Sequence, residues 1–186
     1  MDKREFNPMQ AVKHRFFALR NGAIADAMRR QGAPYKIIFG VNLPQLTAIA
    51  KETGQSEDLA QQLWENSSTR ESMLLAPMVY PREKFSVDKA KSWIRSAVSA
   101  EAVDVLCLKL LRGMEYAPAL ADELILSDRD MDRYGALRMM FNMLPSRIAE
   151  IKSYALAEAS RESALTASIA RQLLEEISFL EEDSES

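Results

Sequence analysis

Residues Tyr35–Met78 read YKIIFGVNLPQLTAIAKETGQSEDLAQQLWENSSTRESMLLAPM, and this stretch decides the fold class. A hinge that contains Gly40 and Pro44 is followed by short segments whose apolar residues recur at helical spacing. Ser67–Leu74, SSTRESML, is echoed further on by Ala159–Leu165, ASRESAL. Similar short helical units are typical of stacked helical repeats. The stretch therefore predicts paired helices that stack side by side.

Capping residues and helix breakers divide the rest of the chain in the same way. Asn7-Pro8 is a typical helix start, and Ser68–Glu71 predicts a capping box in which Ser68 caps the helix and Glu71 reaches back to it. Helices are expected over residues 8–20, 23–30, 44–53, 56–64, 68–80, 86–93, 99–113, 116–126, 130–143, 146–159 and 161–182. No long stretch alternates like a strand. The fold class predicted is all-α, with an irregular helical bundle as the alternative to stacked hairpins.

Size and composition limit the kinds of protein that the chain resembles. It has 186 residues, of which 47% are hydrophobic and 27% charged, as in a globular protein. We expect one domain over residues 1–182 and an acidic tail at 183–186. No apolar run reaches the roughly 20 residues that span a bilayer, and the first ten residues lack the apolar core of a secretion signal. One cysteine and one histidine favour a reducing cytoplasmic location and no metal site, and no motif calls for a cofactor.

The charge of the chain is unevenly distributed. Residues 1–55 carry nine Lys/Arg against four Asp/Glu, whereas residues 150–186 carry three against nine. Arg29, Arg30 and Lys36 lie near the hinge and are candidate contacts to DNA phosphates. The alternative is that these side chains form an ordinary solvated helix surface.

Three segments carry a family resemblance: YKIIFGVNLPQL, LAQQLWENSSTRESMLLA and SWIRSAVSAEAVDVL. Together they resemble the AlkD-type DNA alkylation-repair glycosylases, from about residue 20 to about residue 145. The resemblance implies HEAT-like helical hairpins that form a curved α-solenoid with double-stranded, alkylated DNA in its concave groove. It also implies excision of cationic N3- or N7-alkylated purines, with a lesion that is not drawn into a pocket.

The family motif W-D-x-V-D aligns with Ala100–Asp104, and the resemblance therefore makes Asp104 the candidate catalytic carboxylate. Departure of a cationic base leaves an oxocarbenium-like sugar, which a nearby anion stabilises. The resemblance also places Arg133 near the paired arginines that hold the phosphate beside the lesion, although Tyr134 occupies the second arginine position.

The chain departs from the family at the aromatic residues. Ala100 replaces the ring that packs on the sugar and the lesion, and the only tryptophans are Trp64 and Trp93, both earlier than the family's second aromatic wall. We expect these two to be core residues. A cation–π contribution of about 0.5–2 kcal/mol per ring is therefore missing.

Each candidate residue also has a structural alternative. Asp104 is equally explained as a polar helix position or as half of an ion pair with a neighbouring Lys or Arg, and Arg133 as a partner of Asp130 or Asp132. Cys107 lies on a predicted buried stripe, and His14 is expected at the surface. Two functions remain open: a DNA alkylation-repair protein that binds duplex DNA and excises alkylated purines, or a non-catalytic HEAT-repeat scaffold that binds a protein or a DNA structure. A small-molecule enzyme has no motif to support it.

Overall fold

A computed structural model describes residues 7–161 and 163–184. The chain forms two compact units, one ending at Phe85 and the other beginning at Ser86. Throughout the described residues the regular structure is helical, and the extended backbone makes one isolated bridge, between Ile37 and Thr69. The predicted all-α class is confirmed, while the single domain over residues 1–182 stays a prediction.

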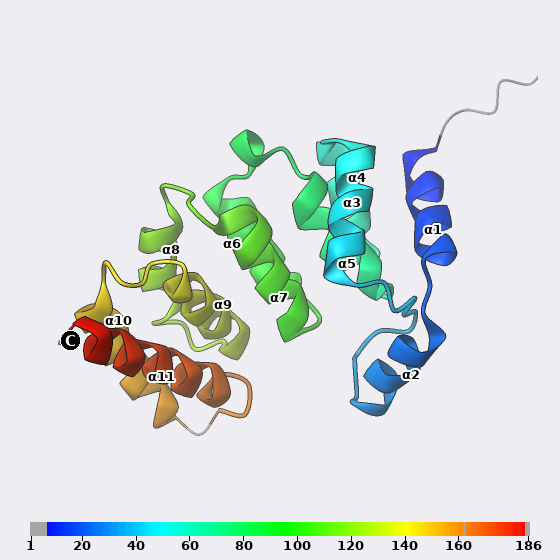
Figure 1. Ribbon diagram of the computed structural model, residues 1–186. Coiled ribbons are helices and arrows are strands. Elements are labelled where there is room, and N and C mark those ends of the chain that lie inside the picture. The colour runs from blue at the N-terminus through cyan, green and yellow to red at the C-terminus, as the bar shows by residue number, and fades with distance from the viewer. Residues whose placement is uncertain (1–6, 162, 185–186) are drawn as a thin grey trace, which may run out of the picture. The chain divides into compact units, whose positions relative to one another are not determined.

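The first unit contains five α-helices and a short 3-10 turn (Figure 1). They are α1 (Pro8–Ala18), α2 (Gly22–Arg30), α3 (Leu43–Thr53), α4 (Glu57–Glu65), α5 (Arg70–Val79) and the turn Arg82–Lys84. Each of the first four begins at an Asn or Ser whose side chain accepts a hydrogen bond from a backbone amide three residues on. Helices α4 and α5 pack as a hairpin, α3 packs against α5, and α1 contacts α3 and α4.

The loop before α3 is held by the buried carboxylate of Glu71. Its oxygens accept hydrogen bonds from the amides of Phe39 at 3.0 Å, Gly40 at 2.9 Å and Val41 at 3.3 Å. The predicted capping box at Ser68 is wrong: Thr69 is the cap of α5 and makes no side-chain cap bond. Glu71 is drawn away because the loop presents three amides that would otherwise be left without partners.

Gly40 is required at the centre of this loop. Its φ is +78°, a conformation that side chains with a Cβ rarely adopt, and a Cβ would lie 2.2 Å from the carbonyl oxygen of Asn21. The close approach lets the amide of Asn21 donate to the carbonyl of Phe39 at 2.8 Å. The loop thereby ties the start of α2 to the start of α5.

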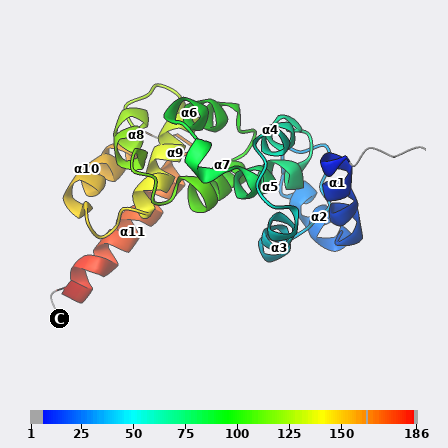
Figure 2. The same ribbon diagram turned by 90° about the horizontal axis from the view of Figure 1, so that it is seen from above.

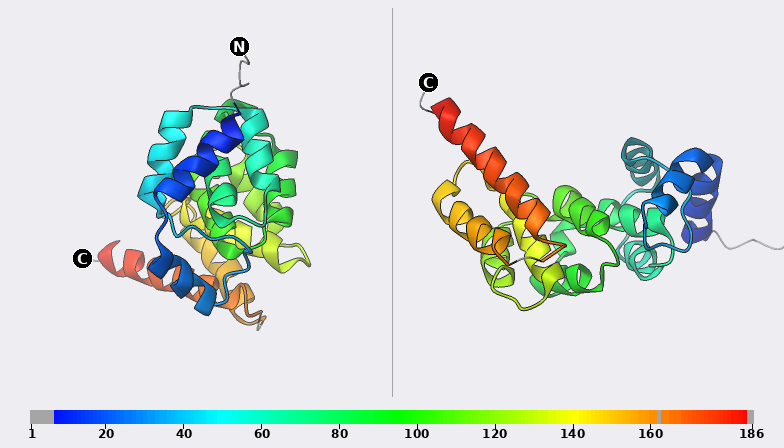
Figure 3. Two further views of the ribbon diagram at one scale, coloured as in Figure 1. Left: turned by 90° about the vertical axis from the view of Figure 1, so that its right-hand side faces the viewer. Right: turned by 90° about the horizontal axis from the view of Figure 1, so that it is seen from below.

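The second unit is built around α9 (Figure 2). Its elements are α6 (Val87–Ser96), α7 (Ala100–Leu106), a π-helical turn (Cys107–Leu111), α8 (Ala117–Leu124), α9 (Asp130–Phe141), α10 (Ile148–Ala159) and α11 (Ala167–Ser184). Helix α9 packs against α6, α7, α8 and α11. Helices α10 and α11 lie side by side, and α11 extends past its neighbour (Figure 3).

The echo between SSTRESML and ASRESAL does not mark equivalent positions in two repeats. Ser67–Leu74 leads into α5, whereas Ala159 ends α10 and the described residues of 160–165 connect α10 to α11. The two segments share a pattern of polar and apolar residues, but one forms a helix start and the other forms the end of a helix and a loop. The acidic tail at 183–186 stays a prediction: α11 includes residues 183 and 184, and residues 185 and 186 lie outside the described part.

The two tryptophans and the cysteine belong to the cores of their units, as predicted. Trp64 is buried in the first unit, and Trp93 and Cys107 are buried in the second. His14 is exposed on α1, also as predicted. The large rings fill space between helices, where their burial contributes to stability.

Candidate active site

Asp104 lies on α7 and faces α9, which supplies both of its partners. The hydroxyl of Tyr134 donates a hydrogen bond to Asp104 Oδ1 at 2.7 Å, and Arg138 Nε lies 2.8 Å from the same oxygen. The Asp104 side chain remains 34% exposed. A carboxylate that is fixed on one side and open on the other is suited to act on a molecule that arrives from solvent.

The local sequence explains how Asp104 reaches this position. Ser99 caps α7 by accepting a hydrogen bond from the amide of Ala102 at 3.1 Å. Ala102, Val103 and Leu106 then turn into the core, which leaves Asp104 at the edge of the buried face. A π-helical turn follows at Cys107–Leu111, and such turns are frequent at functional sites.

The electrostatics of Asp104 combine opposing effects. Burial raises the pKa of Asp104 above its usual range, and the charge of Glu101 raises it further. The Tyr134 hydrogen bond and the Arg138 charge both act to lower this pKa. The two partners from α9 thus preserve the carboxylate form against the cost of desolvation.

Tyr134 and Cys107 are not activated as nucleophiles. Burial raises the pKa of the Tyr134 hydroxyl, and the hydrogen bond to Asp104 raises it further. Burial likewise raises the pKa of the Cys107 thiol, which contacts the carbonyl of Gly135 at 3.8 Å. Both groups keep their protons at neutral pH, which leaves the carboxyl group of Asp104 as the acid of this site.

Arg138 is a site residue that the sequence analysis missed. Its guanidinium lies over the ring of Phe141 at 5.2 Å and beside Asp104, and its side chain is 30% exposed. Its spacing from Tyr134, four residues on a helix, places the two on one face but does not show that this face meets Asp104. The structure brings this arginine, and not Arg133, to Asp104.

Arg133 points in another direction and is nearly buried, with 5% of its side chain exposed. Its Nε donates to Glu158 at 2.8 Å, one terminal nitrogen donates to the carbonyl of Ser127 at 2.8 Å, and the other pairs with Asp130. The alternative that Arg133 pairs with Asp130 is therefore found in the structure. This arrangement holds the start of α9 to α10.

A buried acid on α9 itself, Asp132, completes the attachment of this helix. Asp132 is fully buried and accepts two hydrogen bonds from Arg95 at 3.1 Å and one from the Ser127 hydroxyl at 2.9 Å. Together with the Arg133–Glu158 pair, these bonds fix the start of α9. Tyr134 and Arg138 are thereby held at a constant position relative to Asp104.

Three predicted DNA contacts, Arg29, Arg30 and Lys36, lie exposed in the first unit. Arg29 pairs with Asp26 at 2.8 Å and donates to the carbonyl of Ile38 at 3.1 Å. Arg29 also lines an open hollow of about 450 Å³, together with Ala18, Arg20, Gly22, Ala25, Ile38 and Phe39. Arg20 was not predicted, and it stacks on Phe17 with its guanidinium carbon 3.9 Å from the ring centre.

Ala100 lies at the first position of α7, one turn before Asp104, and is partly exposed. No ring covers the carboxylate from this position. Within residues 7–161 and 163–184, His, Cys, Asp and Glu side chains form no group of three placed to hold a metal ion. None of the helices in the same ranges has the length and apolar character to cross a membrane.

The comparisons with known proteins agree with the all-helical architecture. A family model described as "DNA alkylation repair enzyme" matches residues 12–180. The chain belongs to this family. The match extends through both units and includes Asp104, Tyr134 and Arg138.

One solved structure similar to the chain is described as "a new family of proteins related to the HEAT-like repeat DNA glycosylases with affinity for branched DNA structures". The TM-score is 0.77 at 19% sequence identity, over 89% of this chain and 74% of the other. At this identity the likeness establishes the fold, and the predicted HEAT-like repeat class is confirmed. No curated protein matches the chain.

Proposed function

We propose that the protein binds DNA and excises cationic, N3- or N7-alkylated purines, with Asp104 as the catalytic carboxylate. The observation that carries the proposal is the geometry of Asp104, whose Oδ1 is held by Tyr134 at 2.7 Å and Arg138 at 2.8 Å while the side chain stays open to solvent. Membership of the DNA alkylation repair enzyme family supports the same reaction class.

The reaction needs one fixed negative charge and no strong acid. The bond between the sugar C1′ and N9 of the alkylated purine breaks, and its electron pair leaves with the base, which becomes neutral. Positive charge then develops on the sugar, where the Asp104 carboxylate stabilises it. Water adds to C1′ and gives up a proton to solvent, and the products are a free base and an abasic site.

We assign phosphate contacts in this proposal to exposed cations. Arg138 lies beside Asp104 and is partly open, so it is placed to reach the phosphate next to the reacting sugar. Arg133 receives a structural role, because its nitrogens are engaged by Glu158, Ser127 and Asp130. In the first unit, Arg20 and the predicted residues Arg29, Arg30 and Lys36 supply further contacts to the DNA backbone.

The test is release of 7-methylguanine or 3-methyladenine from duplex DNA treated with a methylating agent. We expect release by the natural protein and by Asp88→Asn, which changes an exposed acid in the same unit. Asp104→Asn is expected to abolish release because the amide carries no charge. Equal release by the natural protein and Asp104→Asn would overturn the catalytic role.

A second candidate is a non-catalytic protein that recognises a DNA structure. It is favoured by Ala100, which leaves the carboxylate without the ring that resemblance to the glycosylases implies. The similar solved structure belongs to proteins described as having affinity for branched DNA. Binding to a four-way junction that exceeds binding to duplex, with no base release, would select this function. Binding only to a protein would select the scaffold alternative.

A further inference from the structure

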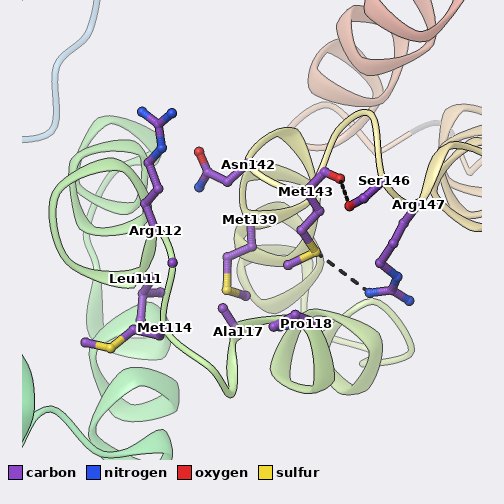
Figure 4. Close-up of a pocket in the computed structure, with 11 residues that line it drawn as sticks. Leu111, Arg112, Met114, Ala117, Pro118, Met139, Asn142, Met143, Ser146 and Arg147 are labelled. Atoms are coloured by element: carbon purple, nitrogen blue, oxygen red, sulfur yellow. Dashed lines mark hydrogen bonds between the residues drawn. The ribbon is translucent and has the colours of Figure 1, made fainter.

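A hollow of about 230 Å³ lies in the second unit beside the π-helical turn that follows α7 (Figure 4). Its walls come from the end of the turn and the loop after it, the first residues of α8, and the end of α9 with the segment that follows it. Its lining residues are Leu111, Arg112, Gly113, Met114, Ala117, Pro118, Met139, Asn142, Met143, Ser146 and Arg147. No residue of this hollow has a role in the excision chemistry described above.

The inner wall is apolar and rich in sulfur. Figure 4 shows the thioethers of Met139 and Met143 facing the space above Ala117 and Pro118, with Met114 at its lower edge. Thioether sulfur is polarisable and makes favourable contacts with aromatic rings. Met143 is held in place by Arg147, whose nitrogen lies 3.8 Å from the sulfur.

The rim is polar on the side that leads toward Asp104. Asn142 and Arg112 lie close together there (Figure 4), and Asn142, the C-cap of α9, follows Arg138 by four residues, about one helical turn. The Asn142 amide approaches the carbonyl of Cys107 at 3.5 Å, and Cys107 follows Asp104 by three residues. The hollow therefore lies beyond the C-terminal ends of the two helices that carry the candidate active site.

Size and chemistry together select the occupant. An engineered apolar cavity of about 150 Å³ holds benzene, so about 230 Å³ holds a single flat ring system and is below the range of drug-sized ligands. A side-chain amide at the rim is the group that pairs with the edge of a base, and an exposed arginine suits the adjoining phosphate.

We propose that this hollow takes one unpaired nucleobase of the bound DNA, stacked on the methionine thioethers with its edge toward Asn142. The proposal rests on the DNA binding proposed above. The base is that of an unpaired nucleotide close to the sugar held at Asp104, and it is not the excised lesion itself. The protein would accordingly prefer DNA with an unpaired base over regular duplex.

The first test compares the affinity for a duplex that carries one bulged adenosine with that for the same duplex carrying a bulged abasic nucleotide. We expect the natural protein to bind the bulged base about fivefold more tightly, a factor within the range of sulfur–aromatic contacts. Ala117→Leu fills the hollow and should remove this preference. Ala119→Leu makes the same change on the exposed side of α8 and should retain it.

A second measurement does not depend on a variant that might perturb folding. With ¹³C-labelled methionine methyl groups, the bulged base should shift the signals of Met114, Met139 and Met143 by ring currents, and the abasic bulge should not. Met78, in the first unit, serves as the reference signal.

The outcomes separate this inference from the proposed function. Equal affinity for the two bulges, a preference that survives in Ala117→Leu, or unshifted methionine signals would each overturn the hollow as a base site while leaving DNA binding and Asp104-dependent excision intact. Absence of binding to every one of these DNAs would overturn the proposed function, and the base site with it. Shifts of the methionine signals by an apolar peptide but not by DNA would identify a protein-binding hollow instead.

Discussion

Tyr134 donates its hydroxyl proton to Asp104 Oδ1 at 2.7 Å, across the interface between α9 and α7. This hydrogen bond lowers the pKa of Asp104, whereas burial raises it, and the net effect is a raised pKa. The tyrosine therefore contributes to keeping Asp104 charged. Tyr134 is buried, with 8% of the residue exposed, so its role is to position the carboxylate and adjust its pKa.

Tyr134→Phe is expected to raise the pKa of Asp104 further. The hydrogen bond favours the charged form of the carboxyl group, so its loss moves the pKa of Asp104 upward. Excision at acidic pH depends on the charged form, and the pH at which activity falls should move upward in the variant. A pH profile of base release, or NMR titration of the labelled carboxyl carbon, measures this.

Tyr154→Phe supplies the control, since it removes a tyrosine hydroxyl from α10 in the same unit. Its pH profile should match that of the natural protein. If Tyr134→Phe left the acidic limb where it is, the hydrogen bond would have no influence on the ionisation of Asp104.

Arg138 and Arg133 are expected to respond in opposite ways to substitution. Arg138→Gln removes a partly exposed cation and should lower the free energy of unfolding by only about 0–1 kcal/mol. The same variant should bind DNA more weakly and release less base. Arg133→Gln breaks a buried ion pair with Glu158 and should lower the free energy of unfolding by about 3–5 kcal/mol. Chemical denaturation and salt-dependent DNA binding of the two variants test the contrast.

The reverse pattern, with Arg133→Gln folded normally and deficient in DNA binding, would restore Arg133 to the phosphate-binding role that its sequence position suggested. A protein destabilised by Arg138→Gln would show instead that the pair with Asp104 is chiefly structural.

The sequence predicted most of the helices because their starts depend on local chemistry. Asn7, Asn42 and Ser56 each accept an amide hydrogen bond at a helix start, as the capping rules require. The role of Glu71 was not predictable in this way. Its partners, the amides of residues 39–41, are about 30 residues away along the chain, and no local rule brings them together.

The same distinction applies to the candidate site. Asp104 was identified from a motif within one helix, whereas its partner Arg138 lies 34 residues later on another helix and becomes visible only when α7 and α9 pack. The choice between Arg133 and Arg138 depends on which face of α9 points inward. Sequence spacing shows that they occupy different faces but does not say which face meets Asp104.

Glu71→Gln is expected to destabilise the first unit. The carboxylate serves three backbone amides and pairs with Arg70, whose side chain is also buried. An amide side chain presents one acceptor oxygen, so at least one buried amide and the arginine charge would lose a partner, at a cost of about 3–5 kcal/mol.

Thermal and denaturant unfolding measure this cost, with Glu83→Gln on the exposed 3-10 turn as the control. Protease cleavage at the loop of residues 39–41 should rise in Glu71→Gln and stay unchanged in Glu83→Gln. Unaltered stability of Glu71→Gln would mean that the loop is held chiefly by Gly40 and its contact with Asn21.

Ala100→Trp tests whether the missing ring limits the chemistry. Ala100 is partly exposed at the start of α7, one turn before Asp104, so a large side chain has room to lie toward solvent beside the carboxylate. A tryptophan face attracts a cationic base by about 0.5–2 kcal/mol, and it also excludes water from the reacting sugar. We expect kcat/KM for the release of alkylated purines to rise about two- to thirtyfold, because the ring strengthens binding of the cationic substrate. Ala119→Trp, on the exposed side of α8, controls for nonspecific DNA binding by an added indole.

The gain from Ala100→Trp should vanish in the double variant with Asp104→Asn, because the ring assists a reaction that the carboxylate makes possible. A gain that persisted without the carboxylate would place the chemistry elsewhere, and no gain at all would favour the protein that recognises a DNA structure without excising a base.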